Sequence, residues 1–216
     1  MNKKEIFNSS LKIRDELKLK NDFEINPIDK SLLPIPPFSL SDDIKLIILG
    51  QDPTVKKPES RLKIKHTLNL DKGGSLRKYI TDICIALGIS FESVYATNVF
   101  KYFYTIPPER TMNVIYSHLD KNLELLEREL SNYPDVPIVT FGLPVLRLLT
   151  KENSEVSYYW DYNRRTKLTN GAFKCCIGSE NKIKRDFFPL PHQPSLAKDF
   201  YKSSLQDYLK FIKSSF

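Results

Sequence analysis

The chain has 216 residues, of which 41% are hydrophobic and 12% aromatic, a composition that supports a packed core and excludes wholesale disorder. The net charge of +7, from 33 Lys and Arg against 26 Asp and Glu, favours a polyanionic partner such as nucleic acid, although solvated lysine faces would give the same charge. No apolar run approaches the length of a membrane span, and the N-terminus lacks the hydrophobic segment of a secretion signal.

Three cysteines, Cys84, Cys175 and Cys176, are too few for a disulfide framework. Adjacent Cys175 and Cys176 would point to opposite faces of a strand, and three thiolates are one short of the usual ligand set of an iron–sulfur cluster. We therefore expect a protein of a reducing compartment, the cytoplasm, with no disulfide and no bound metal.

The N-terminal part contains two predicted segments. Residues 3–20 have the hydrophobic spacing of an amphipathic helix, and the proline-rich residues 27–43 predict an extended lead-in to the first strand. Because helix and lead-in would pack against the rest of the chain, we expect one domain over residues 1–216, with residues 1–43 as its N-terminal helix and lead-in.

The first strand is predicted in the stretch IKLIILGQDPT. Its hydrophobic run is continuous rather than alternating, which is typical of a strand buried on both faces of a parallel sheet. Gly50 and Pro53 end the strand, so Gln51 and Asp52 follow its carboxyl end, where open α/β sheets bind ligands. The structural alternative is that Asp52 only opens an Asp-Pro turn.

Periodicity and turn signals predict the remaining elements. In chain order they are a basic loop (55–65), a strand-like segment (66–70), a Gly-Gly turn capped by Ser75 before a helix (76–87) that Gly88 ends, a strand (93–100), a long helix (111–130), a strand (136–141), a short helix (143–149), a hairpin or loop (158–170), a strand-like segment (172–177), a strand (187–190) and a closing helix (197–213). This alternation predicts a three-layer α/β/α sandwich with a central, mostly parallel, four-stranded sheet.

Three of the predicted strands end in polar side chains: Asp52, Asn98 and His192. Right-handed crossovers place the carboxyl ends of parallel strands at one edge of a sheet. We therefore expect an acid, an amide and an imidazole to meet in one cleft, although each alone could be a turn residue or a structural side chain.

These segments together resemble the uracil-DNA glycosylase superfamily, most closely its first family. The matching motifs run in order from about Leu46 to the C-terminal helix. GQDP (50–53) resembles the family motif GQDPYH, HTLNL (66–70) occupies the position of GLCFSV, and GGSLRKYITDI (73–83) resembles the phosphate-gripping loop and its helix. YATNVF (95–100) resembles the strand whose Asn reads the base, VTFG (139–142) the third strand, and HQPSLAKDFY (192–201) the motif HPSPLS and the helix after it. Each motif alone is weak, and their order carries the resemblance.

The resemblance implies roles in hydrolysing the N-glycosidic bond of a flipped-out nucleotide. Asp52 would orient the attacking water and stabilise the sugar cation, and His192 would donate to the base O2 as charge develops there. Asn98 offers a donor and an acceptor to the Watson–Crick edge of a pyrimidine, and Gln51 would help to hold the base. No metal or organic cofactor is needed.

The resemblance also implies DNA contacts, to double- or single-stranded DNA, by a monomer. A glycine-rich loop at a helix N-terminus would approach phosphates, an apolar wedge would fill the space of the flipped base, and an aromatic, basic insertion (158–167) suits DNA unless it packs its own rings. Gly73, Gly74 and Ser75 form the loop, Leu196 is the wedge with Ser195 before it, and Arg164 and Arg165 belong to the insertion. The basic run 56–65 would lie near DNA or be a solvated loop.

The pocket departs from the family pattern. The Tyr that follows GQDP becomes Thr54, and the stacking Phe becomes Leu68, while His66 stays among the expected base-contacting residues. Smaller side chains predict a wider pocket for a bulkier, C5-substituted pyrimidine, unless His66 or a tyrosine of residues 158–162 fills the space. Uracil remains possible. Further departures are Val55, Phe141 and Gln193.

The sequence therefore predicts a DNA glycosylase that leaves an abasic site, in base-excision repair or in defence against modified foreign DNA. The alternative is a non-catalytic DNA-binding or interaction module of the same fold. An unrelated nucleotide-binding protein is disfavoured, because the chain has no P-loop or GxGxxG motif. The base and the pathway stay open.

Overall fold

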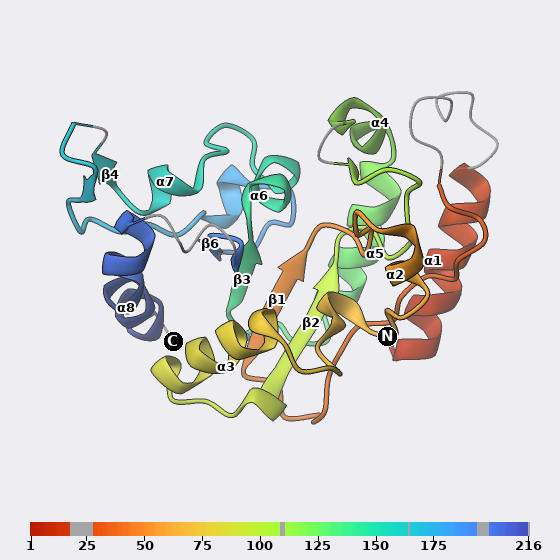
Figure 1. Cartoon of the computed structure of the whole chain (residues 1–216), viewed down its shortest axis with the longest axis horizontal. Helices are drawn as coiled ribbons and strands as arrows, with labels where there is room; N and C mark the ends of the chain where they lie inside the picture. The colour runs from red at the N-terminus through yellow and green to blue at the C-terminus, as the bar shows by residue number, and fades with distance from the viewer. Residues whose placement is uncertain (18–27, 109–110, 164, 194–198, 216) are drawn as a thin grey trace. The chain divides into compact units, whose positions relative to one another are not determined.

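The protein is described by a computed structural model over residues 1–17, 28–108, 111–163, 165–193 and 199–215. Its central element is a four-stranded, all-parallel sheet flanked by helices (Figure 1). The strand order is β2 (Val94–Asn98), β1 (Leu46–Gly50), β3 (Ile138–Phe141) and β6 (Phe187–Leu190). This confirms the predicted three-layer α/β/α class.

All four strands are buried along their whole length. Ile47 of β1 pairs with Ile138 of β3, and Ile138 in turn pairs with Phe187 of β6. Because side chains on both faces of the sheet are covered, the strands need hydrophobic residues at consecutive positions. The continuous runs in the sequence are thereby explained.

The remaining elements of the described residues are short helices, 3₁₀ turns and one hairpin. They are α1 (Lys3–Leu17), α2 (Pro58–Arg61), η2 (Thr67–Asn69), α3 (Ser75–Leu87), η3 (Phe91–Ser93), α4 (Met112–Ser117), α5 (Leu119–Leu130), α6 (Leu143–Leu149), α7 (Val156–Tyr159), β4 (Tyr162–Asn163), β5 (Leu168–Thr169), η5 (Gly178–Glu180) and α8 (Asp199–Lys213). No helix in the described part of the chain has the length and apolarity needed to cross a bilayer.

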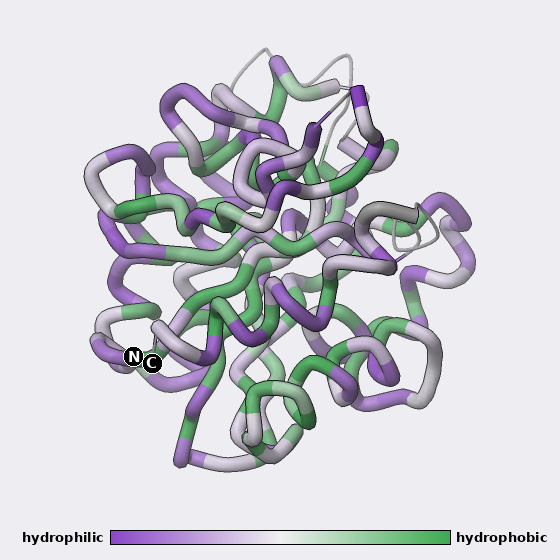
Figure 2. Tube along the Cα trace, turned by 90° about the vertical axis from the view of Figure 1, so that its left-hand side faces the viewer, coloured by the Kyte–Doolittle hydropathy of each residue, from purple (hydrophilic) through white to green (hydrophobic). Residues whose placement is uncertain are grey.

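The chain forms two compact units. Unit 1 comprises Met1–Phe38, Gly50–Asp71 and Ala96–Asp135, and unit 2 comprises the rest. In unit 1, α1 lies beside α5, and in unit 2, α3 lies beside α8 (Figure 1). Hydrophobic and hydrophilic stretches alternate along the chain trace (Figure 2). Each unit contains buried hydrophobic side chains. The expectation of one domain over the whole chain stays a prediction.

Two elements differ from the prediction because of local backbone conformation. Residues 66–70, predicted as strand-like, contain η2, in which Leu68 and Asn69 have φ of 56° and 55°. That left-handed conformation is incompatible with a strand. The long helix predicted over 111–130 breaks at His118 into α4 and α5, because ψ of −4° at His118 departs from the helical value.

Three smaller corrections concern element ends and loops. The predicted basic loop 55–65 contains α2, which begins with Pro58, a residue favoured in the first helical turn. Ser75 is the first residue of α3 and Gly74 its N-cap, while Gly88 ends the helix in a left-handed conformation as predicted. The strand-like segment 172–177 forms only an isolated antiparallel bridge between Cys176 and Phe187.

The predicted hairpin lies in unit 2 as β4 and β5, preceded by α7. Its aromatic residues divide into two groups. Tyr159 and Trp160 are only 1% and 0% exposed, and the Trp160 ring stacks on Tyr208 at 4.4 Å while its Nε1 donates to the Pro189 carbonyl at 2.8 Å. Stacking on DNA is therefore excluded for these two rings, which belong to the core, whereas Tyr158 is exposed.

We predict that Trp160→Ala lowers the free energy of unfolding by about 3–5 kcal/mol, because it removes a buried ring and a buried hydrogen bond. Denaturant unfolding followed by circular dichroism measures this loss. The matched control is Tyr158→Ala, whose exposed ring contributes less than about 1 kcal/mol. A Trp160→Ala variant of unchanged stability but weakened DNA binding would show that the ring serves DNA instead.

Candidate functional site

Asp52 follows β1 in unit 1 and forms a turn with its own chain. Its Oδ1 accepts a hydrogen bond from the Thr54 backbone N–H at 2.8 Å, which is the geometry of an Asx turn. Asp52 therefore opens a turn, which is the structural role that the sequence offers as an alternative to catalysis. The same bond fixes the direction of the carboxylate, as a group that positions a water molecule requires.

Thr54, which stands where the family has tyrosine, has a structural contact of its own. Its Oγ1 accepts a hydrogen bond from the Tyr104 backbone N–H at 2.8 Å. The turn that holds Asp52 is thus tied to the segment that follows β2. A tyrosine hydroxyl at the end of its ring could not make this short contact. Threonine at this position therefore adds a hydrogen bond to Tyr104 and removes an aromatic ring.

Arg61 of α2 fastens the same two segments. Its guanidinium is only 4% exposed and donates to the carbonyls of Val55 at 3.1 Å, Tyr104 at 3.0 Å and Thr105 at 3.0 Å. Its Nη1 also lies 3.5 Å from a carboxylate oxygen of Asp29. The expectation that the basic run 56–65 faces DNA is therefore wrong for Arg61, and nothing in the sequence distinguishes this buried cation from its exposed neighbours.

Asn98, the last residue of β2, is the most unusual polar group of unit 1. It is 1% exposed, and both Oδ1 and Nδ2 are buried without a hydrogen-bond partner. Each unpaired buried polar group destabilises the fold by about 1–3 kcal/mol. A ligand that offers both a hydrogen-bond donor and an acceptor would pair both atoms of this amide.

Gly50 and Leu68 enclose the Asn98 amide. A Cβ at Gly50 would lie 2.2 Å from Asn98 Oδ1 and 3.0 Å from Leu68 Cδ2, so only glycine leaves room for both side chains. Leu68 stands in the strained left-handed turn of η2. The structure therefore brings together two of the predicted base-contacting residues around the end of β1.

Two further predicted base-contacting residues, His66 and Gln51, lie near Leu68 and Gly50 in the chain. His66 precedes η2, and its ring meets the Phe38 ring edge-on at 6.3 Å, with Nδ1 buried and unpaired. Gln51 orients its amide toward Met112, with Nε2 at 3.9 Å from the sulfur. Gln51 also accepts a backbone hydrogen bond from Phe100 at 2.9 Å, which fixes its main chain but leaves its side chain in a weak contact.

Two buried phenols surround the Asp52 segment. Tyr104 Oη lies 3.0 Å from His118 Nδ1, and Tyr102 Oη accepts from Asn122 Nδ2 at 2.9 Å. Burial raises the pKa of both tyrosines well above the usual value, and the Asp52 charge raises each pKa further. The phenols therefore stay neutral, and they add no negative charge near the carboxylate.

His192, the third predicted residue of the cleft, belongs to unit 2 and is exposed. A Cβ at Gly142 would lie 3.2 Å from His192 Cβ, and Gly142 has φ of 89°, so the glycine of VTFG makes room for the His192 segment. The preceding Pro191 carbonyl accepts from Tyr79 Oη at 3.4 Å. The meeting of His192 with Asp52 and Asn98 stays a prediction.

The predicted DNA-contacting residues that are described also belong to unit 2. Gly73 and Gly74 have no atom within 4 Å of an added Cβ, and Ser75 begins α3, whose first turn carries no acidic residue. Arg165 is exposed in the turn between β4 and β5. Arg164, Ser195 and Leu196 lie outside the described residues.

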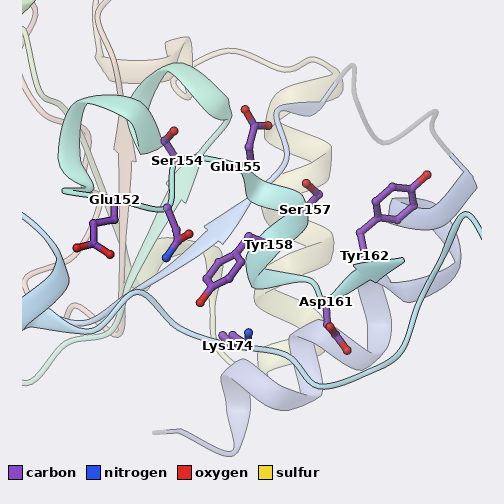
Figure 3. Close-up of a pocket in the computed structure, with 9 residues that line it drawn as sticks. Glu152, Ser154, Glu155, Ser157, Tyr158, Asp161, Tyr162 and Lys174 are labelled. Atoms are coloured by element: carbon purple, nitrogen blue, oxygen red, sulfur yellow. The ribbon is translucent and has the colours of Figure 1, made fainter. Parts of the chain in front are cut away.

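A separate pocket of about 540 Å³ opens beside α7 in unit 2 (Figure 3). Carboxylates of Glu152, Glu155 and Asp161 line it, and Lys174 Nζ lies 4.3 Å from the centre of the Tyr158 ring. The carboxylates disfavour a phosphate backbone, and the pocket contains none of the predicted catalytic or base-contacting residues. Among the described residues no group of three or more His, Cys, Asp or Glu is placed to hold a metal ion.

Asp52 follows β1 and Asn98 ends the neighbouring β2, at the edge where proteins with open α/β sheets generally bind ligands. The sequence profile of the Uracil DNA glycosylase superfamily matches residues 37–214. The chain belongs to this superfamily, whose members are generally DNA glycosylases. A comparison with curated protein sequences finds no match. The closer likeness to the first family stays a prediction.

We predict that Gly50→Ala lowers the free energy of unfolding by about 1–3 kcal/mol, since its methyl group would overlap the Asn98 amide. Thermal unfolding of Gly50→Ala, Asn98→Ala and the double variant measures the effect. The double variant should lose less than the sum of the two single changes, because Asn98→Ala removes the main clash. Additive losses would contradict the close approach of the two residues.

Proposed function

We propose that the protein is a DNA glycosylase that hydrolyses the N-glycosidic bond of a flipped-out pyrimidine and leaves an abasic site. The observation that carries the proposal is the buried, unpaired amide of Asn98 beside the Asp52 turn. An amide in this state suits the paired donor and acceptor on the edge of a base. Membership of the superfamily supports the same reaction.

The roles in this proposal follow the charges that develop as the bond breaks. Asp52, fixed by its turn, orients the attacking water and stabilises positive charge on the sugar. Asn98 reads the base together with Gln51, and His192 donates a hydrogen bond to the base oxygen that becomes negative. The reaction needs no cofactor in this scheme, and the protein acts on DNA as a cytoplasmic monomer.

The DNA contacts of the proposal come from unit 2. Gly73, Gly74 and Ser75 present an open helix N-terminus to a phosphate. Leu196 acts as the wedge, with Ser195 beside it, and Arg164 and Arg165 approach the backbone. The net charge of +7 supports a polyanionic partner.

The base in this proposal is a C5-substituted or otherwise bulky pyrimidine, with uracil as the second candidate. Leu68 replaces an aromatic ring, and Thr54 directs its hydroxyl to Tyr104 N–H. Tyr159 and Trp160 are packed in the core of unit 2, where Trp160 contacts Tyr208. Tyr159 is therefore not the tyrosine that would fill the pocket. The pathway is base-excision repair or defence against modified foreign DNA.

The rival function is a non-catalytic DNA-binding or interaction module of the same fold. The unpaired Asn98 amide favours the enzyme, because a module that no longer binds a base gains stability when this amide is replaced by an apolar side chain. Salt-dependent DNA affinity is expected from both functions. Base release distinguishes them.

We predict that Asp52→Asn lowers the single-turnover rate of base release about 100- to 1000-fold and leaves DNA affinity unchanged. Asparagine keeps an oxygen that can accept the Thr54 N–H, so the turn persists while the charge is lost. The substrates are oligonucleotides and native DNAs with uracil, thymine mismatches, 5-hydroxymethylcytosine or its glucosylated form.

The matched control for this experiment is Asp42→Asn, an exposed residue before β1, which should release base at the wild-type rate. Base release that persists in Asp52→Asn would contradict the assigned role. Absence of release from every substrate by the wild-type protein, with DNA binding intact, would favour the non-catalytic module.

We predict that Leu68→Phe lowers release of a C5-substituted base at least about tenfold more than release of uracil, because the added ring narrows the pocket. Rates on paired substrates that differ only in the target base measure this ratio. Leu68→Met, which nearly conserves volume, serves as the control. Equal losses on both substrates would remove Leu68 as a determinant of specificity.

A further inference from the structure

Lys101 is the only lysine among the described residues that is buried. It follows β2 by three residues, is 1% exposed, and its Nζ lies 2.8 Å from Oε2 of Glu129, which is 0% exposed. The same ammonium donates a hydrogen bond to the Asn98 carbonyl at 2.6 Å. A buried cation therefore joins the end of β2 to α5.

A buried ion pair does not by itself stabilise a fold. Removing two charges from water opposes their attraction, and well-packed hydrophobic side chains of similar volume are often equally or more stable. The pair is therefore better explained by what it positions than by what it stabilises. Its direct contact is with Asn98.

The Asn98 side chain depends on its backbone for orientation. Neither Oδ1 nor Nδ2 has a hydrogen-bond partner, so no side-chain bond selects one direction of the amide. In the next residue of the chain, the Val99 N–H donates a hydrogen bond to the Gly50 carbonyl at 2.9 Å. Lys101 holds the Asn98 carbonyl itself, at the point where the strand ends.

We propose that Lys101, with Glu129 as its counter-ion, is a positioning residue that orients Asn98 for base recognition, an inference that rests on the proposed glycosylase function. The ammonium fixes the Asn98 peptide plane, and the peptide plane directs the amide into the space beside Gly50. Glu129 holds the ammonium in place without contact with the base. Lys101 acts through Asn98 and not on the base itself.

The test replaces both charges together. Lys101→Met alone would leave the Glu129 carboxylate buried and unpaired, which destabilises the whole fold. The variant Lys101→Met/Glu129→Met leaves neither charge of this pair buried without its partner. Lys45→Met is the control, because Lys45 forms a similar 2.8 Å ion pair with Asp43 that is exposed to solvent.

The first measurement is a cycle of single-turnover base release in two backgrounds. In the wild-type background the double replacement should lower the rate about 100-fold, the effect of a displacement of about 1 Å in a recognition group. In an Asn98→Ala background it should lower the rate by no more than about twofold, because the group it positions is absent. Equal fold-losses in both backgrounds would overturn the proposal and make the pair merely structural.

The second measurement does not depend on catalysis. The side-chain amide signals of Asn98 in a ¹H–¹⁵N spectrum are assigned by their absence in Asn98→Ala. They should shift and broaden in Lys101→Met/Glu129→Met and stay unchanged in Lys45→Met. Unchanged Asn98 signals in the double replacement would overturn the positioning role, whereas absence of base release by the wild-type protein would overturn the glycosylase function alone.

Discussion

The candidate site depends on hydrogen bonds that hold the segment after β1 (50–55) against the segment after β2 (98–105). Backbone bonds join their first residues, and farther along Thr54 Oγ1 accepts from Tyr104 N–H. The Arg61 guanidinium closes the far end by bridging carbonyls of both segments. Because several hydrogen bonds join the two segments, the acid and the amide share one support.

Two residues at this support, Asn98 within it and Leu68 beside it, are not stabilised in the same way. The Asn98 amide is buried without a partner, and Leu68 has a left-handed backbone. Both lie next to Gly50, which has no side chain to separate them. Unpaired polar groups and backbone strain destabilise a fold, so their occurrence at one point supports the base-binding role proposed for these residues.

The sequence predicts those elements whose hydrophobic pattern follows directly from burial. The hydrophobic run before Gly50 is readable because a strand covered on both faces accepts no polar side chain. It does not predict the η2 turn, since the left-handed Leu68 depends on packing rather than on hydropathy. Arg61 is equally hidden, because buried and exposed cations look alike in a basic run. The burial of Lys101 could have been predicted, because Lys101 is the single charged residue in the aromatic stretch VFKYFY.

The turn that Asp52 forms and the catalytic role proposed for it are compatible. A carboxylate that must stabilise charge on a sugar acts best when its direction is fixed before the substrate arrives. The Thr54 N–H provides that fixation through Oδ1, and Thr54 is in turn held by Tyr104. The backbone therefore determines where the carboxylate lies. An Asp-Pro turn after a buried strand is thus a suitable support for a catalytic acid.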